Sequence, residues 1–406
     1  MERKKKQMVP SDGGVAERSR FDYDVQDFVF EILSWLPVKS LLRFRCVCKS
    51  WCALISSSCF AKKHLSRAVT SRLQVLEYSL HLFRGGRLRH MDTKDSLKIA
   101  TSELGLKVAN RKLDLPRWCP SDVFSLELGS RMIIVGSCNG LICLQVSQGM
   151  FLLWNPCTRD TKMLPELTSF SDLKFYGFGY DSVTDDYKII VGTESSASGS
   201  LGTKVAVCTL KTGSWRTLEG LEHFELAQNG CLSNGALHWL ETKLNKDKED
   251  YFRISMRIIS FDLAEEEFQE VPSILPERIK QECHTFVRSL IGIGTNRNGL
   301  FVYLYDIITA LTIWTKEEYG GVKVSWTRLV VKIPSKIFLR QRVSYVDYVS
   351  ILENGVVLIG CDPGRLSSEM VLYDPKKETS MIVSAPHDQR LKTVESILCL
   401  ETLVSP

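Results

Sequence analysis

Four cysteines lie close together near the start of the sequence, at Cys46, Cys48, Cys52 and Cys59. Thiolates are nucleophiles and zinc ligands, so this is the densest group of side chains with chemical potential. A structural zinc site usually draws on C-x-x-C pairs or Cys/His units, and the spacing here differs from both. We therefore expect these thiols to hold no metal and no cofactor.

The histidines and the known catalytic motifs give no sign of an active site. The seven histidines form no local pair, and His238 stands beside Trp239 in a strand-like stretch, which predicts a core histidine. The sequence has no G-x-x-x-x-G-K-[ST], no H-E-x-x-H and no G-x-S-x-G motif. We predict no catalytic residues and a protein that is not an enzyme, although distant residues brought together by the fold remain an alternative.

Composition narrows the class of protein. The chain has 406 residues, 44% apolar and 24% charged, which is typical of a folded globular protein. The formal charge of +5 is small for a nucleic-acid binder, and no apolar run approaches the roughly 18–20 residues that span a bilayer. We expect neither nucleic acid nor membrane as a partner. The 13 cysteines, scattered through apolar segments, favour free thiols and the cytoplasm or nucleus.

Three parts of the chain differ in their residue pattern. Residues 1–20 are polar and aperiodic, which predicts a disordered tail. Residues 21–66 carry apolar side chains at helical spacing, with Pro37 ending the first of three helices. Residues 71–401 hold short apolar runs between turn residues, which predicts strands. The expected fold is α+β and multidomain, with a three-helix unit before an all-β domain.

Two kinds of turn recur in the β region. Asn-Gly, which favours two-residue hairpins, occurs at Asn139-Gly140, Asn234-Gly235, Asn298-Gly299 and Asn354-Gly355. An aromatic residue followed by Asn or Asp occurs at Trp154-Asn155, Phe261-Asp262 and Tyr373-Asp374. A unit of roughly 45–60 residues with three or four strands is typical of a β-propeller blade, which gives about six to eight blades. We expect residues 394–400 to close the ring; an irregular β-sandwich array is the alternative.

Residues 28–51 read FVFEILSWLPVKSLLRFRCVCKSW and resemble an F-box. The match includes Leu36-Pro37, Val47-Cys48-Lys49 and Trp51. The opening at residues 21–24 is Phe-Asp-Tyr-Asp, where the family usually has Leu-Pro and an acidic residue. The resemblance implies binding to a Skp-family adaptor, which links F-box proteins to a cullin–RING ubiquitin ligase.

The apolar side chains of this region exceed what three short helices hide among themselves, and such a surplus marks a partner site. We expect the adaptor contact to comprise Phe28, Ile32, Leu33, Leu36, Pro37, Leu41, Leu42, Val47, Cys48 and Trp51. Segment 21–68 has seven basic and four acidic side chains, which suits an acidic partner. Burial of Leu36, Leu41 and Trp51 within the chain would argue against this site and favour a helical cap.

The β region resembles the F-box-associated domain of plant F-box proteins. The resemblance rests on VGSCNGLICL at 135–144, LWNPCT at 153–158, YGFGYD at 176–181 and NGALHWL at 234–240. It implies the substrate-recognition subunit of an SCF-type (Skp–cullin–F-box) E3 ubiquitin ligase, whose β domain binds an unknown target protein for ubiquitination. A non-ligase scaffold that holds the adaptor is the alternative, and a propeller enzyme is another. The loops at 194–203, 242–251 and 315–321 are candidates for target contact.

Overall fold

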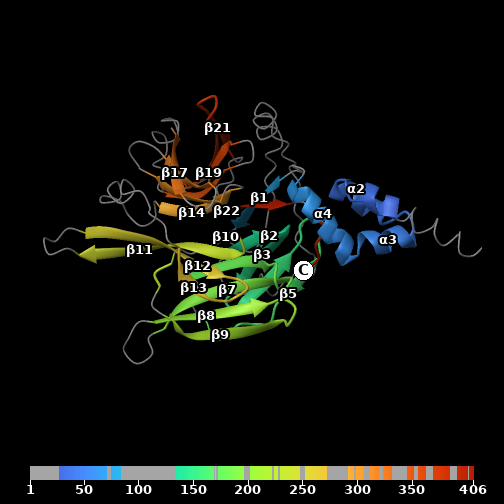
Figure 1. Cartoon of the computed structure of the whole chain (residues 1–406), viewed down its shortest axis with the longest axis horizontal. Coiled ribbons are helices and arrows are strands. Elements are labelled where there is room, and N and C mark those ends of the chain that lie inside the picture. Colours follow the sequence, from blue (N-terminus) through green and yellow to red (C-terminus); the bar gives the residue numbers. More distant parts are fainter. Residues whose placement is uncertain are drawn as a thin grey trace, which may run out of the picture.

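A computed structural model of the chain is shown in Figure 1. It describes residues 27–70, 75–83, 133–168, 170, 172–195, 202–221, 224–226, 229–246, 252–271, 291–296, 299–305, 311–319, 323–331, 345–351, 355–362, 369–384, 391–400 and 402–406. The predicted tail at 1–20 and the F-box opening at 21–24 lie outside these residues. Within the described part of the chain, no helix is long and apolar enough to cross a membrane.

The N-terminal helical region has four helices where three were expected. They cover residues 27–33, α2 (Val38–Phe44), α3 (Lys49–Ile55) and α4 (Ser58–Thr70). The expected third helix is divided at Ser57, whose hydroxyl donates to Leu54 O at 2.7 Å and accepts from Phe60 N at 3.2 Å. A serine that satisfies the first amides of one helix and the last carbonyls of another stops the first and starts the second.

The rest of the described chain is a five-bladed β-propeller. Each blade is a four-stranded antiparallel sheet whose strands follow one another in sequence. The blades are β2 (Ile133–Cys138), β3 (Leu141–Ser147), β4 (Met150–Trp154) and β5 (Thr161–Met163); β6 (Phe175–Asp181), β7 (Asp186–Ser195), β8 (Gly202–Thr209) and β9 (Ser214–Leu221); β10 (Cys231–Ser233), β11 (Ala236–Lys246), β12 (Phe252–Asp262) and β13 (Phe268–Glu270); β14 (Ile291–Asn296), β15 (Gly299–Tyr305), β16 (Leu311–Tyr319) and β17 (Lys323–Val331); β18 (Tyr345–Ile351), β19 (Val357–Asp362), β20 (Glu369–Asp374) and β21 (Thr379–Ser384).

A sixth, two-stranded sheet joins the two ends of the propeller. In it β1 (Val75–Phe83) pairs antiparallel with β22 (Leu391–Leu400). Strand β22 contacts β2 of the first blade and β18 of the last, so it sits between them and closes the ring. The predicted closing strand at 394–400 is part of β22. The expected six to eight blades are corrected to five four-stranded blades and this pair among the described residues.

The recurring turns occupy matching places in the blades. Asn139-Gly140 and Asn234-Gly235 join the first two strands of their blades, with φ of 52° and 82° and of 50° and 77°. Positive φ at both positions is what a tight hairpin of this hand requires. The aromatic–Asn/Asp turns follow the third strand of the first, third and fifth blades. Both kinds of turn lie on the same side of a blade, since the strands alternate in direction.

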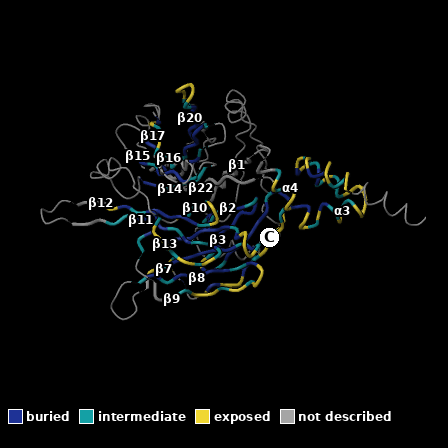
Figure 2. Tube along the Cα trace, viewed as in Figure 1, coloured by how far each residue is buried: buried dark blue, intermediate teal, exposed yellow. Residues whose placement is uncertain are grey.

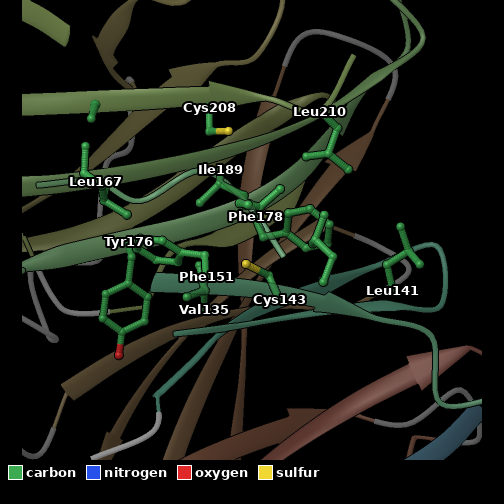
Figure 3. Close-up of a cluster of buried hydrophobic side chains, with 14 of the residues drawn as sticks. Val135, Leu141, Cys143, Phe151, Leu167, Tyr176, Phe178, Ile189, Cys208 and Leu210 are labelled. Carbon is green, nitrogen blue, oxygen red and sulfur yellow. The ribbon is translucent and has the colours of Figure 1, made fainter. Parts of the chain in front are cut away.

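Apolar side chains fill the space between neighbouring blades. Figure 3 shows Cys143 and Phe151 of the first blade with Phe178 and Ile189 of the second in one buried cluster. Trp154 and Trp239 are fully buried, while Trp215 is half-buried. His238 is buried, as predicted. Burial on this scale is the main force that holds such a ring together.

A buried ionic cluster joins the second and third blades. Lys188 Nζ lies 3.0 Å from Asp181 Oδ2 and 2.9 Å from Glu266 Oε1, and it also donates to the Leu263 carbonyl. Desolvation alone would raise the pKa of Asp181, but hydrogen bonds from Thr184 and Lys188 outweigh it and hold that pKa below its usual value. The blades are therefore locked by charge as well as by apolar contact.

Two of the loops expected to contact a target are shorter than the sequence suggested. Strand β11 continues to Lys246 and pairs there with Phe252, so the expected loop at 242–251 is largely hairpin. Strand β16 similarly continues to Tyr319. The tips of all three expected loops lie outside the described residues.

Candidate functional site: the outer face of the helical region

The helical region stands to one side of the propeller (Figure 1). Helix α4 lies next to the sheets, and α2 and α3 lie farther out. Many of its residues are exposed (Figure 2). The exposed large apolar side chains of the described residues number six, and four of them are Phe28, Ile32, Trp35 and Val47. We call these four the outer apolar surface.

The inner side of the same region is a small core. Its eight buried members are Leu33, Val38, Leu41, Ile55, Phe60, Ala61, Cys157 and Leu403. Phe30 packs edge-on against Phe60, with ring centroids 5.3 Å apart. Two of the eight, Cys157 and Leu403, come from outside the helices. The helical region therefore relies on the rest of the chain to complete its core.

Helix α4 holds the segment that follows the first helix. Arg67 donates to Glu31 O at 3.1 Å, bonds the Ser34 hydroxyl and pairs with the Glu31 carboxylate. Its guanidinium lies over the Trp35 ring, 4.5 Å from the ring centroid. A cation over an indole face is attractive and fixes the ring. Arg67 thus orients Trp35 at the outer apolar surface.

His64 makes a second tie from α4 to this segment. Its Nε2 donates to Leu36 O at 2.9 Å, because a carbonyl only accepts. Its Nδ1 is buried without a hydrogen-bond partner among the described residues. Desolvation lowers the pKa of His64, which favours the neutral ring. The segment that carries Trp35 and Leu36 is therefore held at both Arg67 and His64.

Basic side chains are also exposed on the helical region. Lys39 and Arg43 on α2 and Lys49 on α3 are exposed, and within the described part of the chain none of the three has an ion-pair partner. Exposed cations without an ion-pair partner attract an acidic protein and speed its association.

Cys48, in the turn before α3, has a structural role. Cys48 caps α3, since its sulfur accepts a hydrogen bond from Trp51 N at 3.5 Å. The pKa of its thiol is lowered, mainly by a hydrogen bond with the Ser50 hydroxyl. Cys46, Cys48, Cys52 and Cys59 are all free thiols. Among the described residues, no three His, Cys, Asp or Glu side chains gather as a metal site.

The ten residues expected to contact an adaptor divide by exposure. Phe28, Ile32, Pro37, Val47 and Cys48 are exposed, Leu36, Leu42 and Trp51 are half-buried, and Leu33 and Leu41 are buried. Leu33 and Leu41 lie in the core of the helical region, and their expected contact with an adaptor stays a prediction. Of the three residues whose joint burial would have argued against the site, only Leu41 is sealed.

The sequence prediction missed one residue of this surface. Trp35 is 56% exposed. It follows Phe28 by seven residues and Ile32 by three, so helical spacing already placed it on their side.

Comparison with known proteins gives the same division of the chain. Residues 26–63 match the family model described as F-box domain, and residues 108–398 match that of the F-box associated beta propeller domain. An F-box/kelch-repeat protein of Arabidopsis thaliana is 30% identical over 82% of this chain and 87% of its own length. A second F-box protein from that plant is 26% identical over 92% of this chain and 90% of its own, and the F-box protein CPR1 is 29% identical over 75% and 71%.

Proposed function

The chain belongs to the F-box proteins that carry an F-box-associated β-propeller domain, and we propose that it is the substrate-recognition subunit of an SCF-type (Skp–cullin–F-box) E3 ubiquitin ligase. The helical region binds a Skp-family adaptor, and the propeller binds a target protein. The chain itself breaks and forms no bond. It raises the effective concentration of target lysines near the ubiquitin-loaded enzyme.

The observation that carries this proposal is the location of exposed apolar side chains. Four of the six in the described residues lie at Phe28, Ile32, Trp35 and Val47, although the helical region is a small part of the chain. The propeller, by contrast, exposes only Val183 and Val330 among its described residues. Burying a large apolar side chain contributes roughly 1.5–3 kcal/mol, so this concentration supports a protein partner at the helical region.

The experiment compares two substitutions of the same chemistry. Ile32→Asp places a charge in the outer apolar surface, and Val183→Asp places one on the exposed β6–β7 turn of the propeller, where Val183 is 78% exposed. With purified full-length chain and a Skp-family adaptor, Ile32→Asp is expected to weaken binding by about 10- to 100-fold, as loss of a central interface residue does. Val183→Asp is expected to bind like the parent.

Equal binding by both variants would contradict the proposed adaptor surface. The Leu36→Ala/Pro37→Ala double variant provides a second test, since both residues retain exposed area in the structure. Salt dependence tests the role of Lys39, Arg43 and Lys49, because exposed charges are screened and the association rate is expected to fall as salt rises.

A further inference from the structure

The segment that follows β22 lies between the helical region and the first blade. Thr402 is fully buried, and its hydroxyl donates to Asn139 O at 2.9 Å. The Asn155 amide donates to Thr402 O at 3.1 Å and to Val404 O at 2.6 Å. Both asparagines belong to the recurring turns of the first blade. These turns therefore form a seat for residues 402–404.

Neighbouring side chains of this segment enter two different cores. Leu403 is buried in the core of the helical region, together with Cys157 of the first blade. Val404 packs against the apolar cluster between the first and second blades. A three-residue segment thus joins the helical core to the propeller core. Figure 1 places this end of the chain beside β5 and the helical region.

Ring closure is what brings the segment to its seat. Helix α4 ends at Thr70 and leads into β1, while β22 ends at Leu400 and leads into Thr402. In the antiparallel pair of β1 and β22, Val75 is opposite Leu400. The pairing that closes the propeller therefore places Val75, five residues after the end of α4, opposite Leu400, two residues before Thr402.

The residue type at position 155 fits this role. Asn155 Oδ1 accepts from Cys157 N at 2.8 Å, just as Asp262 Oδ1 in the third blade accepts from Ala264 N at 2.8 Å. Asp374 in the fifth blade makes the same turn through Lys376 N. A carboxylate serves the turn equally well but has no proton to donate. Only an amide can both close the turn and hold the two carbonyls of the segment.

We propose that the F-box has a second binding surface, occupied by residues 402–404 of its own chain, and that it becomes competent for the adaptor only when the closed propeller delivers this segment. The proposal rests on the proposed function for its adaptor, but the seat itself does not. An open or damaged propeller would leave the helical core without Leu403, so the receptor would engage the ligase only with its target-binding domain intact.

The first experiment measures amide hydrogen exchange in the full chain and compares Asn155→Asp with Asp262→Asn. Asn155→Asp keeps the turn but removes two donors and sets a negative charge against two carbonyls. Exchange in α3 and α4 is expected to quicken by about tenfold or more, since each lost hydrogen bond to a buried group is worth close to that factor. Exchange in β15 and β16, which supply no residue to either core that the segment enters, is expected to stay at the parent rate in both variants.

Asp262→Asn is expected to leave exchange in α3 and α4 unchanged, because its turn needs only an acceptor. Parent-like protection of α3 and α4 in Asn155→Asp would overturn the seat. This measurement uses no adaptor, so it tests the seat independently of the proposed function. If the parent chain fails to bind a Skp-family adaptor, that result refutes the proposed function and leaves the seat standing.

The second experiment tests the link to adaptor binding. Leu403→Asp puts a charge into the helical core, whereas Ser405→Ala changes an exposed side chain two residues away. The apparent affinity for the adaptor is expected to fall at least about tenfold in Leu403→Asp, in proportion to the fraction of molecules whose helices are open, and to be unchanged in Ser405→Ala. Full affinity in Leu403→Asp would overturn the coupling. If Leu403→Asp unfolds the propeller as well, the adaptor affinity of Asn155→Asp is measured as the temperature rises. Coupling predicts that this affinity falls at a lower temperature than the parent's, and a fall at the same temperature would overturn the coupling.

Discussion

The helical region and the first two blades differ in how far their apolar side chains are buried. The blades bury theirs in one cluster of sixteen residues drawn from their own strands and adjoining loops. The helical region buries eight, two of them borrowed from elsewhere, and exposes four large ones. A unit that exposes apolar side chains and needs residues from other segments to complete its core has little stability of its own and gains stability through contacts. The four predictions that follow test this contrast.

The largest effect is expected at the buried ionic cluster of the propeller. Lys188→Met leaves the buried Asp181 and the largely buried Glu266 without their shared cation. Removing one partner of a buried pair typically costs about 3–5 kcal/mol. The free energy of opening, measured by amide exchange in β7 and β8, is expected to drop by that amount. Lys174→Met, which removes an exposed pair with Asp172, is the control and is expected to change nothing measurable.

A core truncation in the helical region should have a large but local effect. Leu41→Ala removes a fully buried side chain, which costs about 2–5 kcal/mol. Exchange in α2 and α3 is expected to quicken accordingly, while exchange in β7 and β8 stays at the parent rate. Equal quickening in both regions would show that they unfold as one cooperative unit and would remove the contrast.

The propeller could be predicted further than the helical surface. Asn139-Gly140 and Asn234-Gly235 marked real hairpins, because positive φ is a local requirement that residue type reveals. The apolar stripe of the helical region predicted less of the structure. Phe28 and Ile32 face outward while Leu33 faces inward, and a stripe that is apolar on both sides carries no local signal for which side a partner covers.

The sequence around Leu403 does not predict its contact with the helical core, since this contact depends on the path of the whole ring. A residue far from it in the sequence, Asn155, does carry a sign of the contact. The first blade has Asn155 where matching turns have Asp262 and Asp374. The need for a donor at that position becomes clear only when the carbonyls of Thr402 and Val404 are seen beside it.

Acid is expected to loosen the helical region through His64. Its folded-state pKa lies below that of the unfolded chain, because burial disfavours the charged ring. Below the unfolded value of about 6.5 the unfolded state binds the proton more readily, so this stability is complete above that pH and is lost as pH falls below it. Exchange in α4, corrected for the intrinsic pH effect, should quicken as the pH falls from about 7.5 to about 5.5, an interval that includes the unfolded-state pKa of histidine.

His64→Gln keeps a donor for the Leu36 carbonyl but cannot titrate in this range, so its α4 exchange is expected to lose the extra acid dependence. The pKa of His238 in the propeller is lowered by burial too, so His64→Gln is expected to leave acid loosening of β10 and β11 intact. An unchanged acid response of α4 in His64→Gln would assign the effect to another group.

The smallest effect is expected at the ion pair between the two regions. Lys62 on α4 pairs with Asp185 in the β6–β7 turn, but the two side chains are 55% and 43% exposed. Water and salt screen such a pair, and the loss of side-chain freedom in Lys62 offsets most of the attraction. Lys62→Gln is therefore expected to leave α4 exchange unchanged at both low and high salt. Quickened exchange in Lys62→Gln, with parent-like exchange in Asn155→Asp, would mean that charge rather than the seated segment attaches the helices to the propeller.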